Sequence, residues 1–567
     1  MVSAEPAPDP RPWLRKYPAG VPAHVDVPDQ LVTELVSASV RRWPDRTALL
    51  FYGARWSYAR LWRESERFAA ALAAEGIGPG DRVALYLPNC PAYPIALFGL
   101  LRLGAVAVQV SPLYLGQDLA RLLASSRPKA LVTLEILYPH LAAIAGTNPV
   151  PTVFVARLRE FYPWHLRPFV NLVLRRQGRS TAFPSDRNVR PWWRALRSTG
   201  PVPEWRGDPG RSVAVLQYTG GTTGAPRGPM LTHRNLVANV TQLNAWYTTQ
   251  RPGEEVVLAT IPLFHVYGLT VALLLGLSQG GTVVLQTRPD IPELLKLIDR
   301  YRPTQFPGVP ALYQALLDRP DLSRHDLRSI RYCLSGSAPL PVDLQRRFEE
   351  RSGASLVEGY GLSETSPVTH ANPIAGERRI GSIGLPLPDT DQRIVDPASG
   401  SRVLPVGEAG ELAVRGPQVM LGYFEQPEET AAALRDGWFL TGDIARLDDD
   451  GYAYLIDRKK DVIIVGGFKV YPREVEEVLC QHPAVADAAV VGVADAGHGE
   501  VPKAFVVCRA GRSASERELI AFVRERIAHY KAPRSVEFRP TLPRSGVQKL
   551  LRRELKTPAP AATAPAR

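Results

Sequence analysis

The sequence of 567 residues has few cysteines and no long uninterrupted apolar run. Its four cysteines lie far apart and form no C-x-x-C pair, which excludes a disulfide scaffold and a zinc ribbon and favours a reducing compartment. The most apolar segments, residues 92–110 and 268–277, are interrupted or shorter than the ~20 residues that cross a bilayer. The N-terminal segment also lacks an apolar core followed by a cleavage site. The sequence therefore predicts a cytoplasmic chain without a signal peptide or membrane span.

Lysine is scarce as well, because it supplies only ten of the 68 basic residues, and the other 58 are arginine. With 56 acidic residues the net charge is +12, spread along the chain as on a solvated surface. A nucleic-acid-binding protein would show a dense basic stripe with interleaved aromatic residues, so nucleic acid is not expected as a partner. Attraction to anionic small molecules or to an anionic membrane surface remains open.

Hydrophobic residues make up 45% of the chain and charged residues 22%, which is typical of soluble globular proteins and excludes a disordered chain or a coiled coil. The length predicts two to four domains. Strand-like and helix-like segments alternate, and residues 81–88, 90–103 and 105–110 read as a strand, a helix and a second strand. This alternation predicts an α/β fold.

The pattern of apolar and turn-forming residues changes towards the C-terminus. From about Gly381, short apolar runs separated by Gly, Pro and Asp indicate a small β-barrel or sheet subdomain. The charged turn 457–461 (DRKKD) marks the best domain boundary, and a strand at 462–465 and helices at 472–480 and 516–528 are expected beyond it.

The strongest local signal is the segment 218–228, YTGGTTGAPRG, between an apolar strand at 212–216 and a helix expected over 232–244. Its glycines allow a sharp turn that presents backbone N–H groups to an anion, and its threonine hydroxyls add donors. The spacing does not fit a Walker loop. The alternative for a loop of this composition is a plain flexible turn.

Further segments follow in a fixed order. Together with 218–228 they are 262–268 (PLFHVYG), 335–340 (SGSAPL), 358–367 (EGYGLSETSP), 441–443 (TGD), 457–475 and 542–555 (LPRSGVQKLLRREL). In this order they resemble the motifs of the adenylate-forming enzymes, which include acyl-CoA synthetases, adenylation domains of peptide synthetases and firefly luciferase. The resemblance runs from about residue 26 to residue 555 and is greatest to bacterial long-chain fatty acyl-CoA ligases.

The resemblance implies an acyl-CoA synthetase/luciferase-like fold, with two α/β subdomains and a β-barrel in a large N-terminal domain and a small α+β C-terminal domain. The expected divisions are an extended arm (1–25), the adenylation domain (26–457), a mobile C-terminal domain (458–556) and a disordered tail (557–567). Motif alignment places the hinge between the two domains at Lys460.

The resemblance also implies ATP, Mg²⁺ and CoA as ligands. Adenylation depends on charge neutralisation and alignment at the α-phosphate. Glu364 is expected to bind Mg²⁺, which prefers oxygen ligands. Asp443 is expected to accept hydrogen bonds from the ribose, and Tyr360 to face the adenine. Lys549, a mobile ammonium, is expected to stabilise charge at both the acyl carboxylate and the α-phosphate.

The remaining assignments come from the same alignment. The catalytic residues are expected to be Lys549, Glu364, Thr219 and Arg227. ATP or AMP is expected to contact Thr219, Gly220, Gly221, Thr222, Thr223, Gly224, Ser337, Ala338, Pro339, Glu358, Gly359, Tyr360, Gly361, Ser363, Asp443, Arg458 and Lys549. Gly466, Gly467 and Lys469 are expected near CoA, and His265 and Gly336 near the acyl chain. His265 equally fits a core position, and the two glycines equally fit a simple turn.

Three residues depart from the family pattern. Arg227 stands where the family has lysine, Ser363 where it has threonine, and Gln548 where it has the glycine before the catalytic lysine. The arginine is larger and planar, and Gln548 lacks the backbone freedom of glycine. These changes motivate one alternative, a catalytically impaired relative that acts as a binding protein.

Residues 156–176 bear on a possible membrane partner. Leu166, Phe169, Val170, Val173 and Leu174 recur at helical spacing, and basic residues lie on the other face. A short basic amphipathic helix with aromatic residues can lie in a membrane interface; the alternative is a helix packed on its own domain.

The resemblance implies an ATP-dependent ligase that joins a medium- to long-chain fatty acid to CoA through an acyl-adenylate. Fatty acid and CoA would be its substrates, and residues 156–176 would allow peripheral association with the inner face of the membrane. A second alternative is an adenylate-forming ligase for another carboxylic acid or for a carrier-protein acceptor.

Overall fold

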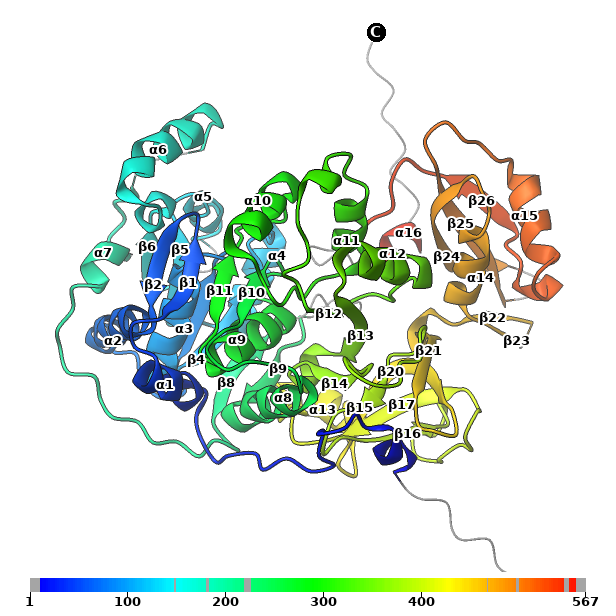
Figure 1. The fold of residues 1–567 in the computed structure, drawn as a ribbon, viewed down its shortest axis with the longest axis horizontal. Coiled ribbons are helices and arrows are strands. Elements are labelled where there is room, and N and C mark those ends of the chain that lie inside the picture. Colours follow the sequence, from blue (N-terminus) through cyan, green and yellow to red (C-terminus); the bar gives the residue numbers. More distant parts are fainter. Residues whose placement is uncertain are drawn as a thin grey trace, which may run out of the picture. The chain divides into compact units, whose positions relative to one another are not determined.

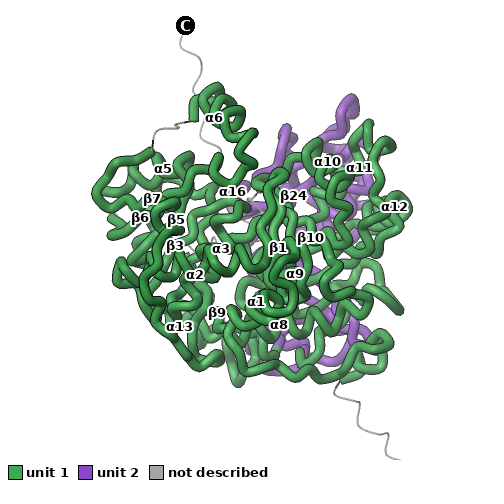
Figure 2. The backbone as a smooth tube through the Cα atoms, turned by 60° about the vertical axis from the view of Figure 1, so that its left-hand side comes forward, with its two compact units in different colours: residues 1–391, 415–439 green, residues 392–414, 440–567 purple. Residues whose placement is uncertain are grey.

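The computed structural model describes residues 11–146, 149–179, 183–218, 226–466, 468–495, 499–544 and 550–556. The chain divides into two compact units (Figure 2), one of residues 1–391 and 415–439 and the other of residues 392–414 and 440–567. Strands and helices alternate through most of the first unit (Figure 1), so the predicted α/β class is confirmed.

The first unit contains an eight-stranded sheet in the order β18-β9-β8-β4-β3-β5-β6-β7. Its strands from β8 to β7 are parallel, whereas β9 runs antiparallel to β8. The predicted strand, helix and strand near residue 100 are β3, α3 and β4, and β4 is buried throughout, as an apolar run in a parallel sheet requires. The elements are β3 (Arg82–Tyr86), α3 (Ala92–Arg102), β4 (Val106–Val110), α4 (Gly116–Ser126), β5 (Ala130–Leu134), β6 (Thr152–Ala156), β7 (Val189–Pro191), β8 (Val213–Gln217), β9 (Pro229–Thr232) and β18 (Gly422–Tyr423).

The first unit also contains two four-stranded sheets, in the orders β10-β11-β1-β2 and β12-β13-β14-β15. Single bridges through Gln305 connect β10 to β12. Helices α10, α11 and α12 pack on these strands around a core that includes Leu258, Phe306 and Leu356. The strands are β1 (Thr47–Phe51), β2 (Ala54–Ser57), β10 (Val256–Ala259), β11 (Thr282–Leu285), β12 (Tyr332–Ser335), β13 (Ser355–Gly361), β14 (Val368–Ala371) and β15 (Leu385–Pro386), and the helices are α1 (Val32–Arg42), α2 (Tyr58–Ala74), α8 (His233–Trp246), α10 (Ile291–Tyr301), α11 (Pro310–Leu317) and α12 (Val342–Ser352).

The second unit begins in a sheet that includes β16, β17, β20 and β21, where the sequence predicts a barrel or sheet, and β21 runs antiparallel to β20. Beyond it a five-stranded sheet, β23-β22-β25-β24 with β26 beside β25, packs its apolar face against α14 and α15. The elements are β16 (Asp391–Val395), β17 (Gly410–Arg415), β20 (Trp438–Leu447), β21 (Ala453–Arg458), β22 (Ile463–Val465), β23 (Phe468–Val470), α14 (Pro472–Cys480), β24 (Val485–Asp495), β25 (Gly499–Cys508), α15 (Glu516–Arg524), β26 (Ser535–Phe538) and α16 (Arg552–Lys556).

Local structure departs from the sequence-based expectation at three places. Strand β9 lies between the glycine-rich loop and α8, where only a helix was expected. Helix α15 ends at Arg524 and not at residue 528, and Ala528 instead precedes a short 3-10 turn, His529–Lys531. The N-terminal arm contains a 3-10 helix, Pro12–Lys16. In the described part of the chain, no helix combines the length and the apolar character that crossing a bilayer requires.

Candidate active site

The glycine-rich loop starts at the carboxyl end of β8, inside the eight-stranded sheet. Thr219, Gly220, Gly221, Thr222, Thr223 and Gly224 lie outside the described residues, so their predicted contacts stay predictions. Beyond the loop, the Arg227 guanidinium forms an ion pair with Glu429 and lies 5.6 Å from the centre of the Tyr423 ring. The cation that replaces the family's lysine is therefore held by two residues of its own unit.

The predicted adenine-binding segments lie side by side, because β12 and β13 are parallel neighbours and Ser335 is in register with Glu358. A Cβ atom on Gly359 would lie 2.7 Å from a Leu334 methyl group, and one on Gly361 would lie 1.9 Å from the Pro367 carbonyl oxygen. Glycine is thus required on both sides of Tyr360, as close packing of the two segments demands. The half-buried Tyr360 ring packs edge-on against His370 at 5.9 Å.

The turn after β12 carries Gly336, Ser337, Ala338 and Pro339. Ser337 has a φ of +69°, which side-chain-bearing residues rarely adopt. The turn is tied to β13, because the backbone N–H of Leu340 donates to a Glu358 carboxylate oxygen at 3.3 Å. The structure therefore brings together all the expected adenine-side residues from the segments 335–340 and 358–363.

Glu364 lies in a 3-10 turn, Ser363–Thr365, directly after β13, and Ser363 is buried. The Tyr423 hydroxyl donates a hydrogen bond to Glu364 Oε1 at 2.9 Å. Burial first, and then the Glu364 carboxylate, raise the pKa of Tyr423, so the phenol keeps the proton that it donates. The hydrogen bond from Tyr423 thus holds one carboxylate oxygen of Glu364 in place and orients the Glu364 side chain.

A magnesium ion fits this arrangement as a companion of nucleotide phosphates. The described residues contain no group of three or more His, Cys, Asp or Glu side chains that could hold a metal by themselves. Mg²⁺ is commonly bound by one or two carboxylates together with substrate phosphates. Glu364, oriented by Tyr423, is the residue that would hold it.

The expected acyl-side residues meet at Tyr267. Its buried hydroxyl donates to the Leu334 carbonyl and, at 3.2 Å, to the Gly308 carbonyl, and burial raises its pKa well above the ordinary value. A Cβ atom on Gly336 would lie 3.3 Å from the Tyr267 ring. The half-buried His265 turns its Nδ1 to the backbone N–H of Tyr267 at 3.2 Å, which favours a local structural role for this nitrogen.

In the second unit, Asp443 on β20 and Arg458 on β21 are in register, and Arg458 Nε lies 3.3 Å from Asp443 Oδ1. The Asp443 side chain is only 8% exposed, so the guanidinium offsets part of the cost of burying its charge. The next residue, Lys459, binds the buried Glu411 carboxylate at 2.8 Å. The expected ribose-binding pair is thus brought together, next to the expected hinge.

The other predicted residues of the second unit are spread along the chain. Lys460 is exposed in a 3-10 turn, Lys459–Asp461, and Gly466 has a φ of +54° at the turn between β22 and β23. Lys469 is exposed on β23. Gly467, Gln548 and Lys549 lie outside the described residues. On either side of the Lys549 segment, Arg544 and Leu550 form an antiparallel bridge.

Arg552, which the sequence analysis did not single out, anchors the lysine motif to the hinge segment. Its guanidinium lies 2.6 Å from Glu476, 3.2 Å from Asp461 and 3.7 Å from Asp457. Burial raises the pKa of both Asp457 and Glu476, and the Arg552 charge opposes this shift. Because its partners are far away in sequence, no local pattern identifies this role.

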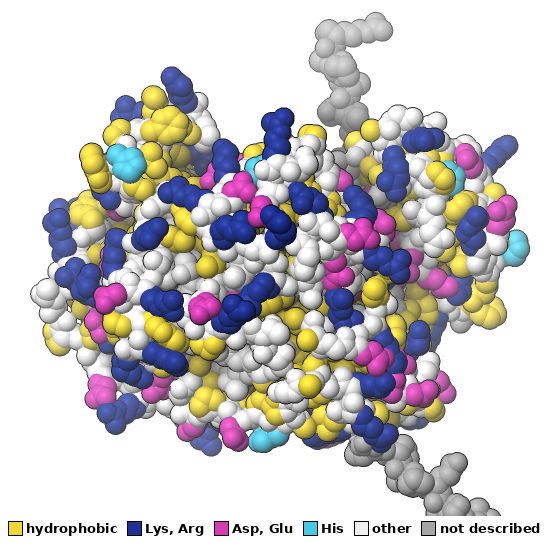
Figure 3. All heavy atoms as spheres, viewed as in Figure 1, with side chains coloured by type: hydrophobic (Ala, Val, Ile, Leu, Met, Phe, Trp, Pro, Cys, Tyr) yellow, Lys and Arg dark blue, Asp and Glu magenta, His cyan; other side chains and the backbone are white. Residues whose placement is uncertain are grey.

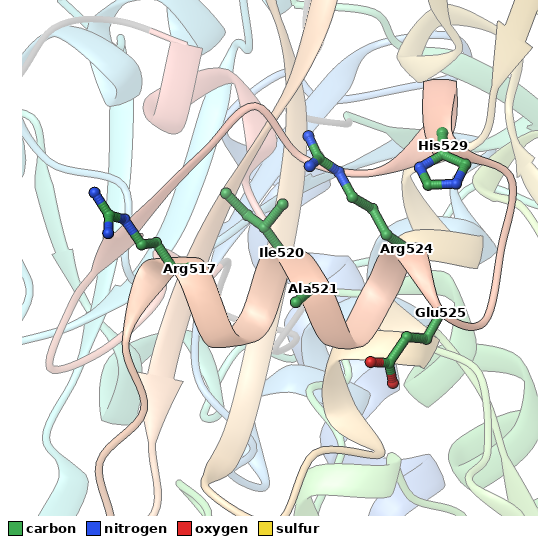
Figure 4. A pocket seen from close by; sticks show the side chains of 6 residues that line it. All are labelled: Arg517, Ile520, Ala521, Arg524, Glu525 and His529. Atoms are coloured by element: carbon green, nitrogen blue, oxygen red, sulfur yellow. The ribbon is translucent and has the colours of Figure 1, made fainter.

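A hollow of about 580 Å³ in the second unit lies along α15 (Figure 4). Arg517 and Arg524 project from the helix on either side of Ile520, and His529 faces them from the following 3-10 turn. All three ionisable side chains are exposed. None of the residues that line it belongs to the predicted site.

Comparison with known proteins identifies the family. Residues 36–424 match the family described as AMP-binding enzyme, and residues 474–549 match the AMP-binding enzyme C-terminal domain. The chain belongs to the AMP-binding enzyme family. The resemblance inferred from the motifs is thereby confirmed.

Relatives of this AMP-binding enzyme cover nearly its whole length. It is 43% identical to a long-chain-fatty-acid–CoA ligase of Bacillus subtilis, over 96% of this chain and 97% of that protein. It is 38% identical to a feruloyl-CoA synthase of an Amycolatopsis species, over 91% and 96% of the two chains. The solved structure of ATP-bound MatB from Rhodopseudomonas palustris has a TM-score of 0.79 and 30% identity, and covers 93% of this chain and 98% of MatB.

The Arg552 cluster gives this AMP-binding enzyme a testable pH dependence. Arg552→Met is expected to destabilise the second unit by about 3 kcal/mol at neutral pH, because it leaves the charges of Asp457 and Glu476 buried without their partner. Both carboxyl groups already have raised pKa values in the folded protein. They will take up protons as the pH falls, so the loss should shrink towards pH ~5. Thermal unfolding of both proteins at neutral and acidic pH measures this; an equal loss at the two pH values would contradict it.

Proposed function

We propose that this AMP-binding enzyme is an ATP-dependent fatty acid–CoA ligase for medium- to long-chain acids. It converts the acid to an acyl-adenylate with release of pyrophosphate, and then transfers the acyl group to CoA with release of AMP. The full-length similarity to the Bacillus subtilis long-chain-fatty-acid–CoA ligase carries this proposal. The lower identity to the feruloyl-CoA synthase makes an aromatic acid the second candidate.

The proposed roles in the first unit follow from its geometry. Tyr360, whose strand β13 pairs with β14, would place its ring against the adenine. Glu364 would hold Mg²⁺, which neutralises phosphate charge when it is bound with ATP. Arg227 would reach the phosphates only after its ion pair with Glu429 breaks. The larger guanidinium would therefore need a rearrangement that the smaller ammonium of a lysine would avoid.

In the second unit, Asp443 would accept hydrogen bonds from the ribose hydroxyls while Arg458 remains beside it as a fixed cation. Gly466 and Lys469 keep their proposed place near the CoA arm. Lys549 would act in adenylation, and Lys460 would be the hinge between the two half-reactions. Domain boundaries at residues 457 and 556 belong to the same proposal.

Acid-dependent exchange of pyrophosphate into ATP tests the activation step and the alternative of an impaired relative. An active ligase catalyses exchange only when a suitable acid is present, because exchange requires reversible adenylate formation. Palmitate should support exchange better than ferulate. An absence of exchange with every acid would favour a binding protein that has lost activity.

We also propose that the surface of α6 (Arg167–Arg176) associates with the inner face of the membrane. Trp164, Phe169 and Leu172 are 80%, 65% and 45% exposed. Figure 3 shows hydrophobic and basic side chains side by side over this helix. Of the predicted segment 156–176, α6 comprises only the last ten residues. Pro163 and Pro168 explain this, because proline is tolerated only in the first turn of a helix. The exposed apolar area is small, so binding would be weak and would depend on anionic lipid.

Arg175→Glu/Arg176→Glu is expected to abolish flotation of the protein with anionic vesicles. Both arginines are exposed, so the change should leave folding intact, whereas Arg167 donates to the backbone carbonyls of Glu160 and Tyr162 and is left unchanged. The matched control is Arg346→Glu/Arg347→Glu on α12, which makes the same charge change at exposed sites. Equal flotation of the two variants would contradict the proposal.

A further inference from the structure

A cavity of about 520 Å³ lies between α6 and α10 in the first unit. Its size falls within the usual range for small-molecule sites. Its wall is mainly apolar and includes Leu158, Val170, Val173 and Leu297. Leu158 and Leu297 are buried, whereas Val170 and Val173 of α6 are only partly covered. The cavity thus lies against α6, where the exposed Phe169 also lines it, and the exposed Trp164 lies in the 3-10 turn that precedes this helix.

The rim of this cavity is positively charged. Arg179, Arg288, Lys296 and Arg300 line it, against the single carboxylate of Glu293. All four cations are exposed, and none forms an ion pair with another residue in the described ranges. Such a rim attracts an anion, whereas the wall below it favours hydrocarbon.

A buried polar group at the cavity lacks a partner. The Tyr301 hydroxyl is shielded from solvent and has no hydrogen-bond partner among the described residues. Leaving such a group unsatisfied is unfavourable, because it has lost its hydrogen bonds to water without replacing them. Arg300 lies beside it, 5.2 Å from the centre of the Tyr301 ring. A ligand oxygen would satisfy both the hydroxyl and the guanidinium once the side chains that cover the hydroxyl move aside.

The cavity is formed at other strands than β8, which leads into the glycine-rich loop. Its residues follow β1, β5, β6 and β11, whereas the loop follows β8. In the eight-stranded sheet β4 and β3 lie between β8 and β5. Three strand spacings of ~4.8 Å place β5 about 14 Å from β8.

We propose that this cavity, the α6–α10 cavity, is a second binding site for a fatty-acid anion, which holds the acid before activation. The hydrocarbon chain lies against the apolar wall, and the carboxylate lies at Arg300, Lys296 and the Tyr301 hydroxyl. The choice of ligand rests on the proposed function, because a ligase for fatty acids needs to take up an acid that partitions into membranes. No covalent step takes place in this cavity.

The test counts fatty-acid sites while the activation site is blocked. Equilibrium dialysis with radiolabelled palmitate is carried out without ATP and with a saturating acyl-sulfamate analogue of the adenylate. One equivalent of palmitate is expected to remain bound per chain. No specific binding under these conditions would overturn the proposal. Pyrophosphate exchange is measured separately, so a failure of the proposed function is distinguished from a failure of this site.

Variants locate the bound acid. Lys296→Glu/Arg300→Glu is expected to lower the affinity for this equivalent at least about tenfold, since it removes two charge-assisted contacts. Tyr301→Phe, which keeps the ring, is expected to lower it several-fold. Arg346→Glu/Arg347→Glu is the control and should bind as the unchanged protein does. If Tyr301→Phe and Lys296→Glu/Arg300→Glu both bind palmitate as tightly as the control variant does, the acid does not lie in this cavity. That result would overturn the assignment even if palmitate binds at another place on the protein.

Discussion

Lys549→Ala is expected to lower acyl-adenylate formation about 100-fold or more, while the conversion of supplied acyl-adenylate and CoA to thioester continues. Removing one group that stabilises transition-state charge costs about 10²–10³ in rate. The lysine acts only in the first half-reaction, because the CoA thiol has to reach the same carbonyl in the second. Pyrophosphate exchange and thioester formation are measured separately on the same preparation.

Lys460→Pro is expected to have the opposite effect and to retain exchange while thioester formation is lost. A hinge has to absorb a large φ/ψ change, which proline forbids. Lys556→Ala, on the exposed end of α16, and Lys460→Ala are the matched controls. If Lys549→Ala and Lys460→Pro lose both half-reactions in proportion, alternation of the C-terminal domain is wrong for this enzyme.

The second large effect is expected for Glu364→Gln, which should lower the rate about 100-fold at low magnesium. A neutral amide is a poor ligand for Mg²⁺, and Glu364 is the carboxylate that the first unit offers after β13. Raising magnesium should restore part of the rate, because the loss lies in metal binding. Steady-state rates over a magnesium series measure both effects.

Tyr423→Phe is the informative companion of this variant. It leaves the carboxylate in place but removes the hydrogen bond of 2.9 Å that orients it. The magnesium requirement should therefore rise several-fold, with little change in the rate at saturating magnesium. A magnesium dependence of Glu364→Gln equal to that of the unchanged enzyme would show that Glu364 does not hold the metal.

The sequence predicted those elements whose signals are local. The βαβ unit around α3, strand β22 and helix α14 were expected from apolar runs of the right length and from their Gly or Pro boundaries. Gly359 and Gly361 were expected at the nucleotide, and this stays a prediction; what the structure adds is that a Cβ atom on either glycine would not fit against its neighbours. Short segments rich in apolar residues, glycine or proline therefore predict local structure without knowledge of distant contacts.

The partners that hold the candidate site could not be predicted in this way. Tyr423 reaches Glu364 across 59 positions in the sequence, and Arg552 reaches Glu476 across 76. Tyr267 connects the acyl-side and adenine-side segments by hydrogen bonds to backbone carbonyls. Every residue has such a carbonyl, so no residue type in the sequence indicates these contacts. Strand β9 was not predicted because its four residues are too few to show an alternation of apolar and polar side chains.

The central claim is tested most directly by mass detection of CoA thioesters after a series of acids, from acetate to stearate and including ferulate, is offered with ATP, magnesium and CoA. The account predicts thioesters of medium- and long-chain fatty acids, formed together with AMP and pyrophosphate. Thioester formation only from ferulate or short-chain acids would contradict the fatty-acid assignment. The absence of any thioester, with intact folding, would contradict ligase activity itself.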